Sequence, residues 1–138
     1  MIATINDCVT YDFSSHEFEM AGKLSFVDNV KIPFSIERIF YIYDVPSGSS
    51  RGAHAHKELS QIIICLSGSL EVELSDGVNT KTIKLNHPSI GLLIPPLIWA
   101  SEKNFSTNAV ALVLASDIYK ELDYLRDYDS FLGERGLN

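Results

Sequence analysis

The hydrophobic and polar positions of this chain follow the two-residue repeat of β-strands from about residue 32 onward. Phe34 to Val45 is rich in aromatic and β-branched residues and stops at Pro46 to Ser50, a loop by composition. Ser69 to Leu74 alternates apolar with polar residues, which is typical of a half-buried strand. Asp76-Gly77 then predicts a hairpin turn, and Thr82 to Leu85 returns with the same alternation.

Three further runs are apolar on both faces, as expected of strands enclosed in a core: Gln61 to Leu66, Gly91 to Ile94 and Ala109 to Ala115. Strands of this length at intervals of roughly ten residues predict a sandwich or a barrel. The predicted fold class is therefore all-β.

One segment follows the helical repeat. Ile118, Leu122 and Leu125 recur at i, i+4 and i+7, behind Ser116 and Asp117 as suitable N-caps. We expect a short C-terminal helix here, over one mouth of the barrel. The first thirty residues show no clear pattern.

Composition narrows the class of protein. The 138 residues, 46% hydrophobic and 21% charged, contain no linker, so residues 1–138 are expected to form one domain. A net charge of −7 with 11 basic residues argues against a nucleic-acid partner, although it is compatible with a small anionic ligand. Cys8 and Cys65 are too sparse for a disulfide framework. The polar opening stretch lacks the apolar segment of a signal peptide, and no apolar run is long enough to span a membrane, so the cytoplasm is predicted.

The candidate chemistry centres on two histidines. His54 and His56, at i and i+2 on a strand, point to one face with Cα atoms about 6.5 Å apart, so both imidazoles can meet one ligand. The spacing Gly-x5-His-x-His-x4-Gln-x6-Gly, from Gly48 to Gly68, resembles the first motif of the cupins. In this motif Gln61 stands where metal-binding cupins place a glutamate.

The second cupin motif indicates whether the protein has the ligands to bind a metal ion. It is traceable as Gly91, Pro95 or Pro96, and Asn104, and Ala100 occupies the position of the last metal-binding histidine. Two imidazoles alone make a weak, open site, even if Gln61 contributed an oxygen. We therefore expect no metal, and the histidines are free to act as acid and base.

Longer segments carry a more specific resemblance. They resemble the sugar 3,4-ketoisomerase (WxcM-like) family from about Gly22 to Phe131; the segments are Arg38–Tyr43, Arg51–Lys57, Gln61–Ser69, Gly91–Trp99, Leu112–Ser116 and Asp123–Tyr128. The resemblance implies a homodimer of cupin (double-stranded β-helix, or jelly-roll) barrels. It also implies a cofactor-free isomerase that converts dTDP-4-keto-6-deoxyglucose into dTDP-3-keto-6-deoxyhexose for aminosugars of bacterial surface glycans such as O-antigen lipopolysaccharide.

The resemblance assigns His54 as the base that takes the C3 proton and His56 as the proton shuttle between the sugar oxygens. An imidazole can both take and give a proton near physiological pH. No redox cofactor is needed, because the oxidation level moves only within the substrate.

Six further residues are substrate-binding candidates, and most have a structural alternative. Arg38 and Phe40 are two positions apart on a strand, so both side chains could face the cavity, although Arg38 could equally belong to a core ion pair. Arg51 and Lys57 flank the histidines and could bind pyrophosphate, while Arg51 could instead anchor the loop. The remaining two are Trp99, a cavity wall as well as a core residue, and Gln61, which could simply be a hydrogen-bonded strand residue. Other groups have structural alternatives too. The histidine pair could be structural, and His16 and His87 are expected to be exposed. The cluster Asp123–Asp129 is expected to be a solvated surface or an interface and not a second site.

Three residues depart from the family pattern and line its sugar site. Phe40 replaces a frequent tyrosine, Ala100 replaces histidine or arginine, and Ala21 replaces a larger polar or aromatic residue. These departures leave the C4 configuration of the product open. They also keep a second function class in play, a non-catalytic sugar-nucleotide-binding cupin or regulatory domain. In the predicted dimer, residues 1–30 supply a strand to the partner's sheet, because an exposed sheet edge tends to acquire one.

Overall fold

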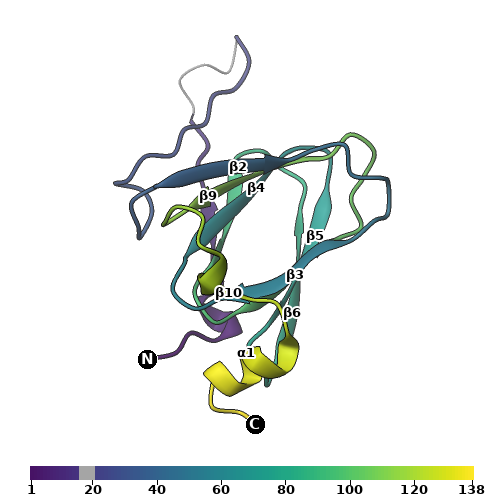
Figure 1. Ribbon diagram of the computed structural model, residues 1–138. Helices are drawn as coiled ribbons and strands as arrows, with labels where there is room; N and C mark the ends of the chain where they lie inside the picture. Colours follow the sequence, from purple (N-terminus) through teal and green to yellow (C-terminus); the bar gives the residue numbers. More distant parts are fainter. Residues whose placement is uncertain (16–20) are drawn as a thin grey trace.

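The computed structural model describes residues 1–15 and 21–138, which form two antiparallel five-stranded sheets facing each other (Figure 1). The first sheet has the strand order β1-β7-β4-β9-β2 and the second β10-β3-β8-β5-β6. The strands are β1 (Thr10–Asp12), β2 (Arg38–Ile42), β3 (Arg51–His56), β4 (Gln61–Ser67), β5 (Leu70–Ser75), β6 (Thr80–Leu85), β7 (Ile90–Ile94), β8 (Trp99–Lys103), β9 (Val110–Ala115) and β10 (Tyr124–Leu125). Two 3-10 turns, η1 (Ile5–Asp7) and η2 (Glu121–Asp123), and one helix, α1 (Tyr128–Glu134), complete the chain. The predicted all-β barrel fold is confirmed.

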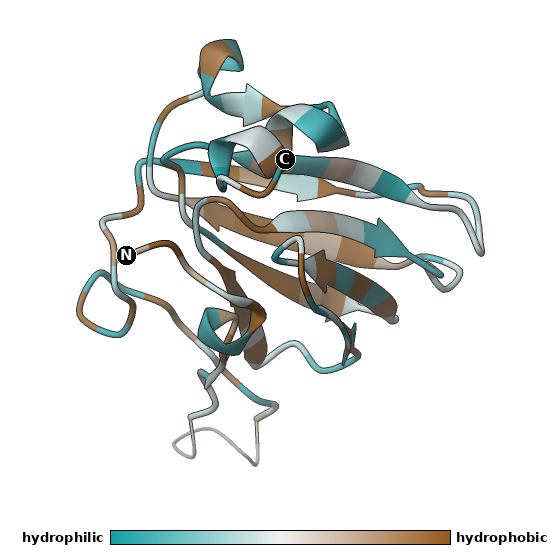
Figure 2. Ribbon diagram, turned by 90° about the horizontal axis from the view of Figure 1, so that it is seen from below, coloured by the Kyte–Doolittle hydropathy of each residue, from teal (hydrophilic) through white to brown (hydrophobic). Residues whose placement is uncertain are grey.

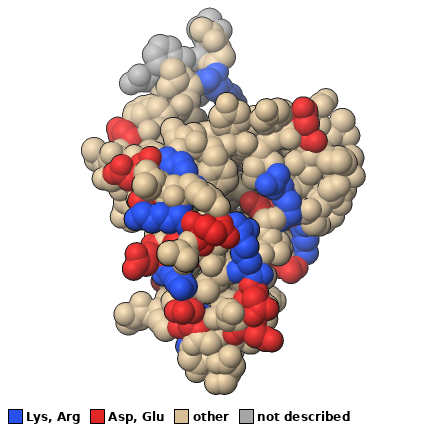
Figure 3. Space-filling view, in the orientation of Figure 1, with Lys and Arg blue, Asp and Glu red and all other residues tan. Residues whose placement is uncertain are grey.

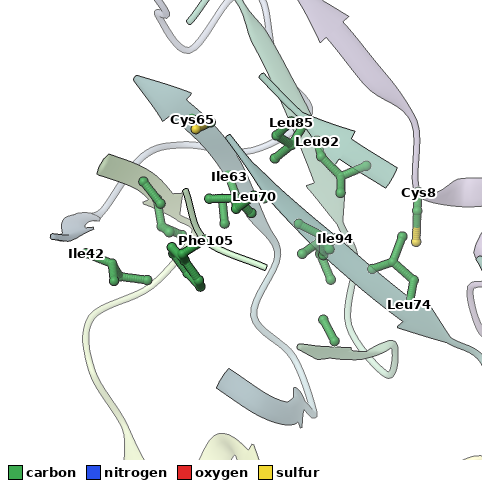
Figure 4. Packing of buried hydrophobic residues seen from close by; sticks show 14 of the residues in the cluster. Cys8, Ile42, Ile63, Cys65, Leu70, Leu74, Leu85, Leu92, Ile94 and Phe105 are labelled. Carbon is green, nitrogen blue, oxygen red and sulfur yellow. The ribbon is translucent and has the colours of Figure 1, made fainter. Parts of the chain in front are cut away.

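The core lies between the two sheets. Alternation along β5 turns Leu70, Val72 and Leu74 inward, where all three are fully buried. Figure 4 shows these residues' neighbours from β4 and β7, including Ile63 and Leu92, packed in the same cluster. Hydrophobic residues are concentrated in the central strands (Figure 2). Burial of this alternating apolar surface holds the sheets together.

β4 is apolar on both faces because both faces are covered. Ile63 and Cys65 point into the barrel, whereas Ile62 and Ile64 point outward beneath Phe13 and Ile32 of the N-terminal region. Cys65 and Cys8 are both buried free thiols. The prediction of an enclosed strand here is confirmed, with its end one residue later than expected.

The expected position of the C-terminal helix is wrong. Ile118 and Leu122 are 59% and 90% exposed, so their helical spacing has no core to face. Leu125 is buried, but in β10, where it pairs with Ala55 of β3. The helix begins instead after Asp127, whose side chain accepts a hydrogen bond from the Ser130 N–H, and it buries Phe131.

Part of the N-terminal region forms a strand, because β1 pairs with β7 of the same chain. Exchange of a strand from residues 1–30 with a partner stays a prediction. Ala21 is exposed at the start of an N-terminal excursion, residues 21–30, which projects from the barrel in Figure 1. His16 lies outside the described residues. A cavity of about 550 Å³ separates part of this excursion from the outer face of the first sheet. In the described part of the chain, no helix has the length and apolar character needed to cross a membrane.

Candidate active site

The two predicted histidines lie side by side on β3. Their ring centroids are 5.0 Å apart in an edge-to-face arrangement. His54 is half-buried and pairs directly opposite Ala100 of β8, whose own side chain belongs to the barrel core. His56 is 5% exposed. The strand alternation therefore brings both imidazoles to one inward face, as predicted.

Asp123 completes the pair. Its Oδ2 atom accepts a hydrogen bond from Nδ1 of His56 at 3.0 Å, and its Oδ1 atom accepts one from the Glu58 N–H at 2.8 Å. A carboxylate can only accept, so Nδ1 carries the proton and Nε2 keeps its lone pair for chemistry. The interpretation of Asp123 as solvated surface is therefore wrong. No sequence signal identifies this contact, because the two residues are 67 positions apart.

Tyr124 is the second residue that sequence reasoning missed as part of the site. It pairs opposite His56 across β10 and β3, and its ring centroid lies 4.3 Å from His56 and 5.1 Å from His54. The guanidinium carbon of Arg126 lies 4.3 Å from the centroid of this ring, and Arg126 makes two hydrogen bonds to Glu121. The segment between β9 and α1 thus forms one wall beside the histidines.

Burial and nearby positive charges lower the pKa of both histidines, so both rings are uncharged at neutral pH. Burial is the main cause that lowers the pKa of His54 to about 4, and the neighbouring His56, Arg126 and Arg51 lower it further. A hydrogen bond with the Gly52 backbone opposes this shift. Burial also lowers the pKa of His56, although the hydrogen bond and charge of Asp123 act in the opposite direction. Both rings are therefore available as proton acceptors at neutral pH.

Across the barrel, Arg38 and Gln61 lie in one row because both pair with Ala115 of β9. Arg38 and Phe40 are two positions apart on β2, so both side chains point inward. The guanidinium carbon of Arg38 lies 5.2 Å from the centroid of the Phe40 ring. The Nε and Nη2 atoms of Arg38 are buried and have no hydrogen-bond partner among the described residues. Its charge also lowers the pKa of His56. A buried guanidinium with free donors is suited to an anionic or carbonyl oxygen, and nothing described pairs it in the core.

The other three predicted residues lie at the two ends of β3 and at the start of β8. Arg51 is exposed at the far end of β3, opposite Glu102, although its charge acts on His54. Lys57 is exposed on the outer side, where its N–H donates to the Asp123 carbonyl. The expectation that Trp99 lines the cavity is wrong: its ring packs against Tyr128 and Phe131 beneath α1, on the opposite face of β8 from Ala100.

The side chains near the histidines offer few metal ligands. Ala100 faces His54 where a metal-binding cupin would add a histidine. Within residues 1–15 and 21–138, no group of three or more histidine, cysteine, aspartate or glutamate side chains is arranged to hold a metal ion. The metal-free enzyme stays a prediction.

Known proteins share this sequence and fold. The chain matches the family described as FdtA: WxcM-like, C-terminal over residues 6–136. It is 47% identical to the TDP-4-oxo-6-deoxy-alpha-D-glucose-3,4-oxoisomerase of Aneurinibacillus thermoaerophilus over 104 residues, 75% of each protein.

Two crystal structures extend the comparison. One is a histidine-to-asparagine mutant of the 3,4-ketoisomerase QdtA from Thermoanaerobacterium thermosaccharolyticum, in complex with TDP-4-keto-6-deoxyglucose. It has a TM-score of 0.88 at 38% identity, covering 97% of this chain and 95% of that one. The other is a 3,4-ketoisomerase from Helicobacter canadensis, with a TM-score of 0.86 at 48% identity and coverage of 96% and 98%. The chain therefore belongs to the WxcM-like family of sugar 3,4-ketoisomerases.

Proposed function

We propose that this protein is a 3,4-ketoisomerase that moves the keto group of dTDP-4-keto-6-deoxyglucose from C4 to C3 through an enediol. The observation that carries the proposal is the pair of buried, uncharged imidazoles on one inward face, one of them held by Asp123. The named relatives act on, or are bound to, this sugar nucleotide.

The chemistry requires a base at carbon and a proton carrier at oxygen. We assign His54 to the C3 proton, because its low pKa keeps the ring unprotonated and ready to accept. His56 is assigned to the oxygens, because Asp123 holds its Nδ1 proton and stabilises the imidazolium that forms when Nε2 takes another. One proton is removed from C3 and one is added at C4, so the isomerisation needs no redox partner.

Arg38 is our candidate for an oxygen of the substrate, since its Nε and Nη2 donors are buried and unpaired. Phe40 lies against its guanidinium and supplies the apolar side of the same contact. Gln61 stands beside Arg38 in the row and offers an amide to the sugar. Arg51, exposed at the end of β3, remains our candidate for the pyrophosphate, with Lys57 on the outer side as the weaker one.

We also propose that two chains associate into a homodimer through the first sheet. β2 is an edge strand of this sheet, and its outward residues Ile39 and Tyr41 are 56% and 63% exposed. Leu24 and Phe26 of the N-terminal excursion are also largely exposed. An edge strand beside an apolar face favours association. Residues 1–138 form one folded unit in this proposal.

The cellular role follows from the substrate class. We place the protein in the cytoplasm, in the synthesis of aminosugars for surface glycans such as O-antigen lipopolysaccharide. A 3-keto sugar nucleotide is the substrate that an aminotransferase acting at C3 would consume.

One experiment tests the activity. The purified protein is incubated with dTDP-4-keto-6-deoxyglucose in deuterated water, and the product is identified by NMR. We expect the keto group at C3 and deuterium at C4. A protein that binds the substrate without exchange or conversion would instead be the non-catalytic sugar-nucleotide-binding alternative.

A further inference from the structure

Glu102 is an acidic residue that points into the barrel. On β8 it pairs opposite Val72 of β5, and its neighbour in the same row, Ala100, pairs opposite Leu74 and His54. Residues directly opposite in an antiparallel sheet share a face. Val72, Leu74 and Ala100 all belong to the core cluster, so the Glu102 carboxyl shares the inward face of the histidines.

The carboxyl lies against the backbone next to His54. A Cβ atom placed on Gly52 would be 1.9 Å from Oε2 of Glu102 and 2.9 Å from its Cδ atom. Gly52 also has a φ of +80°, within the bulge between Arg51 and His54, a backbone conformation that favours glycine. The backbone of Gly52 in turn makes a hydrogen bond with His54. Glu102 and His54 therefore both lie against Gly52, and the small Ala100 is opposite His54 on the same face.

The carboxyl has no strong partner. Among the described residues, its only hydrogen bond is with its own backbone, and its Coulombic partner is the exposed Arg51. Burial is the main cause that raises the pKa of Glu102 to about 7, with Arg51 opposing. The titratable groups on the inward face also include His54 and His56 on β3 and the Cys65 thiol on β4, whose pKa is raised by burial; the inward residues of β5 are apolar. Figure 3 shows a hollow in the molecular surface with basic and acidic side chains at its margin.

We propose that Glu102 is a further catalytic residue of this site, whose protonated carboxyl donates a hydrogen bond to the sugar oxygen on which negative charge develops. The inference rests on the proposed isomerase activity. When the C3–H bond breaks, its proton passes to His54 and its electron pair forms the C3–C4 double bond, which displaces the carbonyl electrons onto the C4 oxygen. The Glu102 O–H donates to that oxygen and keeps its proton.

This role predicts a specific pH dependence. The protonated carboxyl offers a donor to the enediolate, whereas a carboxylate would repel it. Turnover should therefore fall as the pH rises through about 7, where Glu102 loses its proton. A purely structural acid in the same place would alter thermal stability and leave this alkaline limb unchanged.

The test compares Glu102→Gln and Glu102→Ala with the wild type on dTDP-4-keto-6-deoxyglucose between pH 5 and 9. The amide of Glu102→Gln keeps a donor of the same shape without titrating, so we expect most of the activity at pH 6 and no decline above pH 7. Removing an oxyanion donor typically costs about 10²- to 10³-fold in kcat, which is the loss expected for Glu102→Ala. Glu73→Gln is the matched control, since Glu73 is exposed on β5 and pairs with Lys103.

The outcomes separate this inference from the proposed function. A wild-type protein without turnover would overturn the proposed function itself. Wild-type turnover with Glu102→Ala within threefold of normal, or an alkaline limb that persists in Glu102→Gln, would overturn the role of Glu102. Melting curves of each variant identify misfolding, and Glu102→Gln then provides the decisive comparison because it preserves shape.

Discussion

The contact between His56 and Asp123 allows the sharpest prediction about how the site works. Asp123→Asn keeps the side-chain shape and the Oδ1 acceptor for the Glu58 N–H. It replaces the charged acceptor of His56 with the amide NH2 group, which cannot accept from Nδ1 and selects the wrong tautomer. The fold should therefore persist while the proton carrier is impaired.

The magnitude follows from the geometry. The bond from Nδ1 of His56 to Oδ2 of Asp123 is 3.0 Å long, and the two side chains are only 5% and 15% exposed, so solvent screens it little. A hydrogen bond to a charged group contributes about 1.5–3 kcal/mol. If that free energy is lost from a transition state in which His56 carries a second proton, kcat falls roughly 10- to 150-fold.

The assay measures kcat and KM by NMR, together with the melting temperature. We expect a lower kcat, an almost unchanged KM and a folded protein. Asp117→Asn is the matched control, because Asp117 lies on the same segment but pairs with Lys120. Turnover of Asp123→Asn within twofold of the Asp117→Asn value would refute the assignment of Asp123 as the residue that positions His56.

Five other predictions concern the same protein. His54→Asn should abolish deuterium exchange at C3 and lower the turnover rate about 10²- to 10⁴-fold. His56→Asn should slow turnover but retain that exchange. The opposite pattern would show that the roles of the two histidines are reversed. Because the pKa of His54 is lowered to about 4, the base stays neutral and kcat/KM should remain level down to about pH 5, and an acid limb near the ordinary histidine value would contradict this. Chelators should leave activity unchanged, and restoration of a lost activity by one divalent ion would disprove the metal-free enzyme. dTDP at about a hundred times its Kd should stabilise the fold by about 2.7 kcal/mol, and the absence of a thermal shift at millimolar dTDP would count against the substrate class. Light scattering should give the mass of a dimer at micromolar concentration, and a monomeric mass would count against the dimer.

Local patterns in the sequence were sufficient for the strands and for the histidine pair. The alternation of Leu70, Val72 and Leu74 predicts β5 because side chains one residue apart on a strand point to opposite faces. The same rule places His54 and His56 on one face, and the structure places both there. Each of these inferences depends on neighbours in the chain only.

The tertiary structure decided which face is enclosed and which distant residues meet. Trp99 and Glu102 lie on opposite faces of β8, and only the closure of the barrel turns Glu102 inward and leaves Trp99 beneath α1. The helical spacing of Ile118 and Leu122 gave a wrong prediction. A short helix is stable mainly when its apolar face packs against the core, and these two side chains are exposed. Asp123 reaches His56 across 67 residues through the pairing of β10 with β3. Alternation specifies two faces of a strand, but packing against the rest of the chain determines what each face meets.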